Sequence, residues 1–222
     1  MEQDAFMRGT YTENNKNNFR GCAVGCSIYS INKLLGTAHD YDEHVDMAET
    51  LQIPEWLVRL EDKIFEGLSE KDSKEWPLSF SEAINVGADL DKIKPAFLVY
   101  VLESIPGMHE VVHRAIALWK RDDLYSDAWK KESRAIYDDA ADAAYAADAA
   151  DVANAATANA TSNAYDYANA YANACAIAYA NANATANAAD YAANAVCAGR
   201  EREEIYKKFS DKLIELIKNC ES

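Results

Sequence analysis

The chain has 222 residues, enough for one domain or two small ones with a buried core. Half of its residues are apolar and 27% are charged, which excludes both a fully disordered chain and a membrane protein. The 22 Lys and Arg residues stand against 37 Asp and Glu residues, so the net charge is −15. A protein of this charge does not hold nucleic acid through phosphate contacts. It suits a basic partner, or the imitation of a polyanion.

The first residues and the cysteines indicate a cytoplasmic protein. Glu2 and Asp4 lie where a secretion signal would need an apolar segment, and no run of 18 apolar residues occurs anywhere. The five cysteines are an odd number in a chain without an export signal, so we expect reduced thiols.

The first 46 residues predict an extended lead-in, one helix and an acidic connection. Residues 1–20 are polar and typical of a loose arm. Between residues 21 and 35 apolar side chains recur every three or four positions, as on one face of a helix, and Gly36 is a suitable stop. Residues 39–46 then form an Asp-rich connection.

Helical periodicity continues beyond this connection. Pro54 suits the beginning of a helix because it lacks an amide hydrogen. A shorter helix is expected over residues 80–86, ended by Gly87, and Asp91 can cap the helix after it. Another helix is expected around Val112, Ile116 and Trp119. Residues 1–134 are therefore predicted to form a compact N-terminal helical domain.

Residues 135–198 are about half alanine, and Asn, Asp and Tyr make up most of the remainder. Alanine is the best helix former and no Gly or Pro interrupts the tract, so we predict a helical hairpin with a turn near residues 161–163. Local alternation of alanine with other residues leaves a repetitive β arrangement as the alternative. Alanine methyl groups bury little area, so the tract must fold back on the first half or pair with a second chain, as in a homodimer.

Asn and Asp recur along the alanine tract at steps of three and four, which places them on one face of a helix. This face can be solvated, form a regular array for a repetitive target, or line a groove for a ligand or partner. After the tract, residues 199–222 predict a charged amphipathic helix that closes the core. The sequence as a whole therefore predicts an all-α fold.

Three stretches, GCAVGCSIYSINKLLG, IPEWLVRLEDKIFEGL and GADLDKIKPAFLVYVLESI, occur in this order. Trp129, the alanine tract and the terminal segment SDKLIELIK follow them. The arrangement resembles a family without an established activity that is encoded largely by bacteriophages and prophages. The resemblance covers nearly the whole chain and implies a cytoplasmic phage accessory protein made inside the host cell. It assigns no catalytic, binding or metal-ligating residue.

Four residues have the spacing of a two-Cys, two-His zinc site: Cys22, Cys26, His39 and His44. The residues between them disagree with a zinc finger, because Ser30 and Gly36 stand where a finger has an aromatic residue and a leucine. At positions i and i+4 of one helix, the two cysteines can also be small core residues. We assign no metal here, and the zinc interpretation stays open as the alternative.

The segment His109-Glu110-Val111-Val112-His113 matches the H-E-x-x-H pattern of zinc hydrolases, in which two His bind zinc and the Glu activates water. Glu132 could supply a third ligand. The extended signature, with its Gly and third His, is missing, and no β-rich lobe precedes the segment. We therefore favour helical, partly exposed histidines and keep a zinc-dependent hydrolase as the alternative.

A nucleophilic cysteine is the remaining enzymatic hypothesis. Cys22 near a helix start could have a lowered thiol pKa, with His39 or His44 as its base. Nothing in the sequence brings these residues together, so no catalytic residue is assigned.

The charge and the resemblance together predict a binding protein, not an enzyme, that inhibits a host defence component in the manner of an anti-CRISPR protein. The preferred route is occlusion of a basic, nucleic-acid-binding surface, with no cofactor and no direct binding to nucleic acid or membrane. The second route is sequestration of a signalling nucleotide in a helical groove. The sequence has no phosphate-cradling motif, and the cations that would have to converge on the Asp-rich stripe are Arg20, Arg59, Arg114 and Lys120.

Overall fold

The computed structural model describes residues 5–15, 18–104, 110–136, 138–139 and 200–220. Most of these residues are helical, which confirms the predicted all-α fold. The chain divides into two compact units: the first is Met1–Ile93 with Glu203–Ser222, and the second is Lys94–Arg202. Among the described residues, no helix has both the length and the apolar character needed to cross a bilayer.

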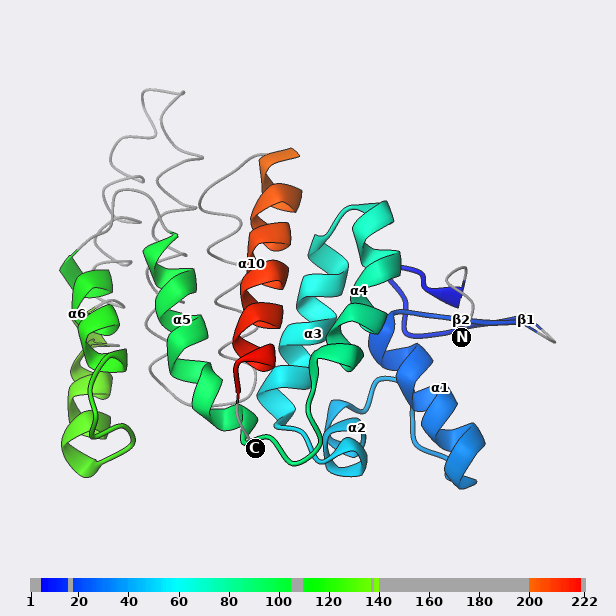
Figure 1. The fold of residues 1–222 in the computed structure, drawn as a ribbon, viewed down its shortest axis with the longest axis horizontal. Coiled ribbons are helices and arrows are strands. Elements are labelled where there is room, and N and C mark those ends of the chain that lie inside the picture. Colours follow the sequence, from blue (N-terminus) through cyan, green and yellow to red (C-terminus); the bar gives the residue numbers. More distant parts are fainter. Residues whose placement is uncertain (1–4, 16–17, 105–109, 137, 140–199, 221–222) are drawn as a thin grey trace. The chain divides into compact units, whose positions relative to one another are not determined.

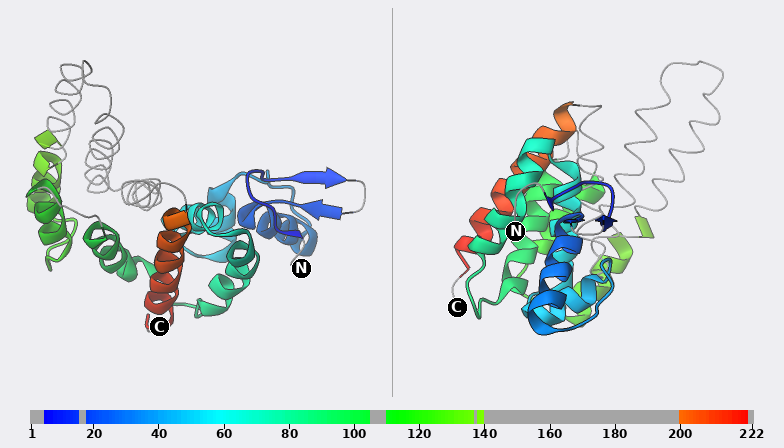
Figure 2. Two further views of the ribbon diagram at one scale, coloured as in Figure 1. Left: turned by 90° about the horizontal axis from the view of Figure 1, so that it is seen from above. Right: turned by 90° about the vertical axis from the view of Figure 1, so that its right-hand side faces the viewer.

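The first unit begins with a short β hairpin and continues with helices (Figures 1 and 2). Strands β1 and β2 are antiparallel, with Asn14 opposite Phe19. Helix α1 contacts α2, α3 and β2, and α3 also contacts α4. The elements in chain order are β1 (Glu13–Asn15), β2 (Asn18–Arg20), α1 (Ala23–Leu35), α2 (His44–Leu51), α3 (Glu55–Gly67), α4 (Glu70–Ala83), the 3₁₀ helix η2 (Leu90–Ile93) and α10 (Arg200–Lys218).

The second unit contains α5 (Lys94–Glu103) and α6 (Glu110–Trp119), which contact each other, and a helix over residues 127–136. Trp119 and Trp129 are buried with their ring centroids 5.0 Å apart. The Trp129 indole donates to the Leu118 carbonyl at 3.0 Å. Nearly all of the predicted alanine-rich hairpin, including its Asn and Asp stripe, lies outside the described residues. The boundaries predicted at residues 134 and 198 stay predictions.

Several helix signals in the sequence are confirmed. Helix α1 ends at Gly36, which adopts a left-handed conformation with φ of 69°. Pro54 is the N-cap of α3, with an extended backbone. Helix α6 carries the expected apolar face. Of the predicted α10 stripe, Ile205, Phe209, Leu213 and Ile217 are buried, and Leu216 is partly exposed.

Other predictions were wrong about where elements begin. The polar lead-in contains the β1–β2 hairpin, and the expected acidic connection gives way to α2 at His44. Helix α4 spans Glu70–Ala83 instead of residues 80–86 because Ser69 caps it, accepting from the Asp72 amide, and Pro77 is accommodated inside it. Asp91 lies within η2 rather than before a helix.

The last helix packs against α3 in the core of the first unit (Figure 1). A Cβ atom on Gly67 would lie 2.3 Å from ring carbons of Tyr206, and the Tyr206 side chain is fully buried. Only glycine permits this approach of the α3 backbone to the α10 ring. Segments far apart in the sequence therefore share one core.

Candidate protein-binding surface

Helix α2 presents acidic side chains without basic neighbours in sequence. Between Lys33 and Arg59 the chain has six Asp and Glu residues and no Lys or Arg. Asp46 and Glu49 are three residues apart and so lie near one side of the helix, and Glu43, its N-cap residue, precedes them by the same step. We call the group of acidic side chains around α2 the α2 acidic surface: Asp40, Asp42, Glu43, Asp46 and Glu49. All are exposed except Asp46, which is partly buried.

An open groove of about 490 Å³ borders this surface, and we call it the α2–η2 groove. The buried side chains of Ala48, Ile53 and Leu90 contribute its apolar base. Its acidic side chains come from α2, the start of α3 and the segment that enters η2: Glu49, Glu55, Asp89 and Asp91. The described residues that line it include no Lys or Arg.

The turn between α2 and α3 shapes one wall of the groove. Gln52 ends α2 in a left-handed conformation with φ of 54°, and its amide donates to the Glu49 carbonyl at 3.3 Å. The Ile53 amide donates to the Ala48 carbonyl at 3.1 Å, and Pro54 then begins α3. These bonds satisfy the last carbonyls of α2 and reverse the chain within three residues. Both helix ends are thereby fixed at the same groove.

The carboxylates of the groove differ in how they are held. Glu55 accepts from Arg59 at 2.7 Å, Asp91 accepts from the Trp56 indole at 2.8 Å, and Asp89 lies 3.4 Å from the Lys92 ammonium. The Glu49 carboxylate has no hydrogen bond or ion pair with any residue that the structure describes. Glu49 is therefore the carboxylate in the groove most available to an incoming cation.

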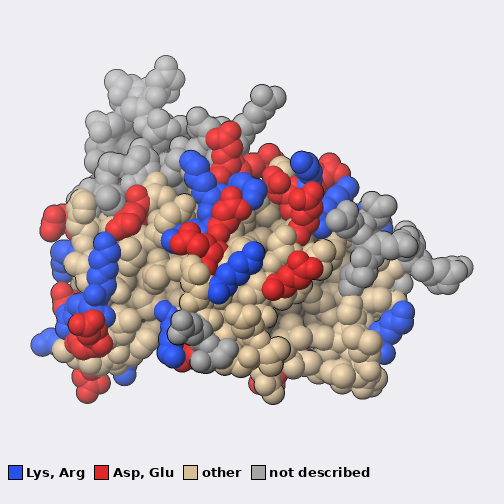
Figure 3. Space-filling view, in the orientation of Figure 1, with Lys and Arg blue, Asp and Glu red and all other residues tan. Residues whose placement is uncertain are grey.

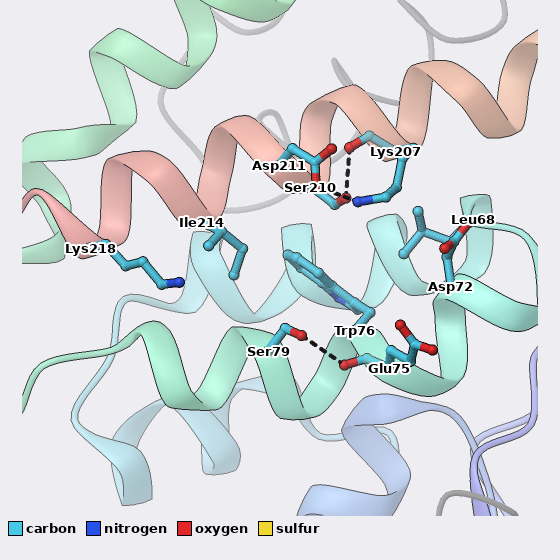
Figure 4. Close-up of a pocket in the computed structure, with 10 residues that line it drawn as sticks. All are labelled: Leu68, Asp72, Glu75, Trp76, Ser79, Lys207, Ser210, Asp211, Ile214 and Lys218. Atoms are coloured by element: carbon cyan, nitrogen blue, oxygen red, sulfur yellow. Dashed lines mark hydrogen bonds and ion pairs between the residues drawn. The ribbon is translucent and has the colours of Figure 1, made fainter.

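A second hollow, of about 270 Å³, lies between α4 and α10. Figure 4 shows the Trp76 ring between the two helices, with Lys207 and Lys218 on α10 and Asp72 and Glu75 on α4. Lys207 forms an ion pair with its α10 neighbour Asp211. Basic and acidic side chains are interleaved over this face (Figure 3). The α4–α10 hollow thus favours neither sign of charge in a ligand.

Below the surface, α3 holds two adjacent carboxyl groups. Glu61 is 2% exposed, and burial, reinforced by the charge of Asp62, raises its pKa well above the ordinary value. Within the described residues, neither Glu61 Oε2 nor Asp62 Oδ1 has a hydrogen-bond partner. The other Asp62 oxygen lies 3.3 Å from His44 Nε2 and accepts from the Tyr11 hydroxyl at 3.4 Å. Burial and the Asp62 charge raise the pKa of Tyr11 to about 12.

The residues with zinc-finger spacing make separate contacts. Cys22 caps α1, where its Sγ accepts from the Gly25 amide at 3.5 Å, and the Cys26 thiol donates to the carbonyls of Ala5 and Gly21. His39 Nδ1 lies 2.6 Å from Asp46 Oδ2, whereas His44 contacts Asp62. In the part of the chain that the structure describes, no three His, Cys, Asp or Glu side chains gather as metal ligands.

The hypothesis that Cys22 has a lowered thiol pKa was wrong. Cys22 is 1% exposed, and burial together with the charge of Asp62 raises its pKa well above the ordinary value. Burial also raises the pKa of Cys26 to about 11. His39 and His44, the proposed bases, are engaged by Asp46 and Asp62 instead. Both thiols therefore serve as buried core groups near α1.

The H-E-x-x-H segment is described only in part, since His109 lies outside the described residues. Glu110 and His113 are both exposed on α6, and Glu132, the third candidate ligand, forms an ion pair with Arg121. The cations considered for phosphate binding are also paired, Arg59 with Glu55, Arg114 with Asp139 and Lys120 with Glu103, and Arg20 lies in β2. Several side chains that the sequence patterns suggested as zinc ligands or phosphate-binding cations are thus paired with oppositely charged residues in the described structure.

Sequence reasoning missed the α2–η2 groove. Its walls come from residues 45–55 and 88–91, and no local pattern joins these segments. The one signal that could have drawn attention to it is the stretch without Lys or Arg between Lys33 and Arg59. Comparison with protein-family models, with curated proteins and with solved structures finds no match to the chain.

Proposed function

We propose that the chain is an acidic binding protein that covers a basic, nucleic-acid-binding surface of another protein. The α2 acidic surface is the observation that carries this proposal. Its carboxylates occupy a stretch without Lys or Arg, whereas charges of both signs are interleaved over α4 and α10. A surface of one sign attracts and selects partners of the opposite sign.

The spacing of the α2 charges supports imitation of a nucleic acid strand. Glu43, Asp46 and Glu49 are three residues apart, which corresponds to about 4.5 Å along a helix axis. One strand of B-DNA carries a phosphate charge about every 3.4 Å. The acidic side of α2 therefore has a linear charge density comparable to that of the ligand it would replace.

The resemblance to a phage-encoded family supplies the setting of the proposal. The covered protein would be a defence component in the host cytoplasm, and the chain would inhibit it by stoichiometric binding. Such inhibition needs no catalytic group, and the buried thiols of Cys22 and Cys26 and the contacts of His39 and His44 with Asp46 and Asp62 fit this role. We keep a homodimer as part of the proposal, to be examined by light scattering.

The test uses the full chain and two matched variants. Asp42→Asn/Glu43→Gln removes two charges from the α2 acidic surface, and Glu82→Gln/Glu203→Gln removes two exposed charges elsewhere on the first unit. A partner is captured from host-cell extract, purified, and mixed with its own nucleic acid and the chain in a gel-shift competition at 50 and 300 mM salt.

We expect the chain to displace the nucleic acid from the partner. Asp42→Asn/Glu43→Gln should compete at least tenfold more weakly, and the control variant should compete as well as the natural chain. Raised salt should weaken competition, because exposed charges are screened. Simultaneous binding of chain and nucleic acid to the partner would contradict the proposal. Equal loss in both variants would contradict the assignment of the α2 acidic surface.

A further inference from the structure

We infer that the α2–η2 groove accepts an arginine side chain carried by an extended basic segment of the partner. The inference rests on the proposed function and deepens it, since it names the chemical group that is recognised and the place where it binds. The groove lies within the first unit.

The groove combines an apolar base with acidic side chains, and an arginine has the complementary construction. The buried base consists of Ala48, Ile53 and Leu90, and the partly exposed Val45 and Pro54 extend the apolar lining. A long cationic side chain buries its methylene groups against such a surface and keeps its charged head at the polar edge. An acidic or neutral side chain could contact the apolar base but would not neutralise the carboxylates of the groove.

The charges within the groove require a cation. Glu49 has no partner among the described residues, and the described lining contains no Lys or Arg that could neutralise it. The Asp89 carboxylate forms an ion pair with Lys92, and both side chains of that pair are more than half exposed. Exposed pairs of this kind contribute little to stability, so Asp89 can exchange its partner at small cost.

Arginine fits the groove better than lysine because several carboxylates are arranged around one base. A guanidinium has five N–H donors in a plane and can bridge two carboxylates, whereas an ammonium is a compact and strongly hydrated point charge. Asp91 is held in place by the Trp56 indole through Oδ1 and keeps its second oxygen for another donor. Glu49, Asp89 and Asp91 together therefore offer more acceptor positions than one ammonium can use.

The α4–α10 hollow is the comparison that shows why the assignment is specific. It too has carboxylates, and Trp76 adds an aromatic ring, but Lys207 and Lys218 line it and would repel a guanidinium. Asp211 is already paired with Lys207. A cationic peptide is therefore expected in the α2–η2 groove and not in the α4–α10 hollow.

Indole signals of the full chain provide the test. Trp56 donates to Asp91 in the groove, while Trp76 and Trp129 donate to backbone carbonyls elsewhere. The ¹⁵N-labelled chain is titrated with a peptide of alternating alanine and arginine, and with matched peptides that carry lysine or citrulline instead. Citrulline keeps the shape of arginine and lacks its charge. Trp56→Phe assigns the Trp56 signal.

We expect the arginine peptide to shift the Trp56 signal saturably and to leave those of Trp76 and Trp129 unchanged. Glu49→Gln/Asp89→Asn should weaken binding at least tenfold, and the control Glu82→Gln/Glu203→Gln should bind as the natural chain does. Equal binding of the citrulline peptide, equal binding of the lysine peptide, an unmoved Trp56 signal or equal loss in both variants would each overturn the inference.

The outcome can be separated from that of the proposed function. If Glu49→Gln/Asp89→Asn competes fully for the partner while Asp42→Asn/Glu43→Gln does not, the proposed function holds and the arginine site is refuted. If the arginine peptide binds in the groove but no partner is displaced from nucleic acid, the arginine site holds and the proposed function fails.

Discussion

The carboxyl groups of α2 and those of α3 lie a few residues apart in sequence and meet opposite surroundings. Glu43, the N-cap residue of α2, and Glu49 on α2 are both exposed. On α3, Glu61 is fully enclosed, and its pKa is raised well above the usual range by burial and by Asp62. The α2 carboxylates are therefore open to a partner, whereas the surroundings of Glu61 disfavour its ionised form.

The contrast teaches that net charge is a poor measure of an acidic binding surface. The value of −15 counts Glu61 like any exposed carboxylate, although its environment disfavours the ionised form. What attracts a basic partner is the local density of exposed charge without counter-ions. The acidic stretch around α2 meets that condition, and the paired charges of α4 and α10 do not.

The largest expected effect comes from placing a new carboxylate in each environment. Val58→Asp buries a charge at a fully enclosed position on α3, so we expect the free energy of unfolding to fall by roughly 3–5 kcal/mol. Val86→Asp places the same group at a position that is 99% exposed, and its effect should stay within about 0.5 kcal/mol. Urea denaturation followed by circular dichroism measures both. Similar losses would show that the two environments do not differ as described.

Trp76→Phe and Trp56→Phe each remove an indole hydrogen bond, the first to a buried acceptor and the second to an exposed one. The Trp76 indole donates to the Glu61 carbonyl at 3.2 Å inside the core, and the Trp56 indole donates to the exposed carboxylate of Asp91. We expect Trp76→Phe to cost about 1–3 kcal/mol and Trp56→Phe about 1 kcal/mol, because water can replace only the second donor. Thermal unfolding gives the comparison, and the reverse order would contradict it.

Glu61→Gln should change how stability depends on pH. The folded-state pKa of Glu61 lies above its unfolded value, so the stability it contributes is fully present below the unfolded pKa near 4.5 and is lost as pH rises through the folded pKa. Glutamine does not ionise. Denaturation at pH 4, 6 and 8 should therefore show that the stability of Glu61→Gln, relative to that of the natural chain, increases as pH rises. A constant difference for Glu61→Gln would contradict the description of its environment.

The smallest effect is expected for Glu49→Gln/Asp89→Asn. Both groups are exposed and the Asp89–Lys92 pair is weak, so the free energy of unfolding should change by no more than about 0.5 kcal/mol. Any gain from relieved repulsion around α2 should appear at 20 mM salt and vanish at 300 mM, since exposed charges are then screened. A large loss of stability would mean that these carboxylates support the fold and are not reserved for a partner.

The sequence predicted the longer helices well because residues close to each helix end determine where the helix begins or ends. The stop at Gly36, the start at Pro54 and the apolar stripe of α10 each lie within a few residues of the element they define. Helix α2 escaped notice because its eight residues carry few apolar side chains, and its stability depends on burying Met47 and Ala48 beside α3. Helix α4 begins ten residues before the predicted start because Ser69 caps it and Pro77 is accommodated inside it.

The negative charge of the candidate site could be predicted from the sequence, whereas the shape of the groove could not. The excess of Asp and Glu predicts a basic partner, but the groove needs residues 45–55 to meet residues 88–91, which is a tertiary contact. The same limit affected the cysteine and histidine motifs. Cys22 and His44 do come near one carboxyl group, Asp62, and that group belongs to neither motif.

The packing of Tyr206 against Gly67 makes the order of synthesis a physical variable. The first unit begins with Met1–Ile93 and is completed by Glu203–Ser222, so a ribosome must add the whole of Lys94–Arg202 between its two parts. At about 5–20 residues per second, this takes roughly 5–20 s. During that interval the α3 surface that receives Tyr206 is open to solvent, to chaperones and to other nascent chains. Translation speed through the alanine-rich tract therefore sets how long a half-built core is exposed in the cell.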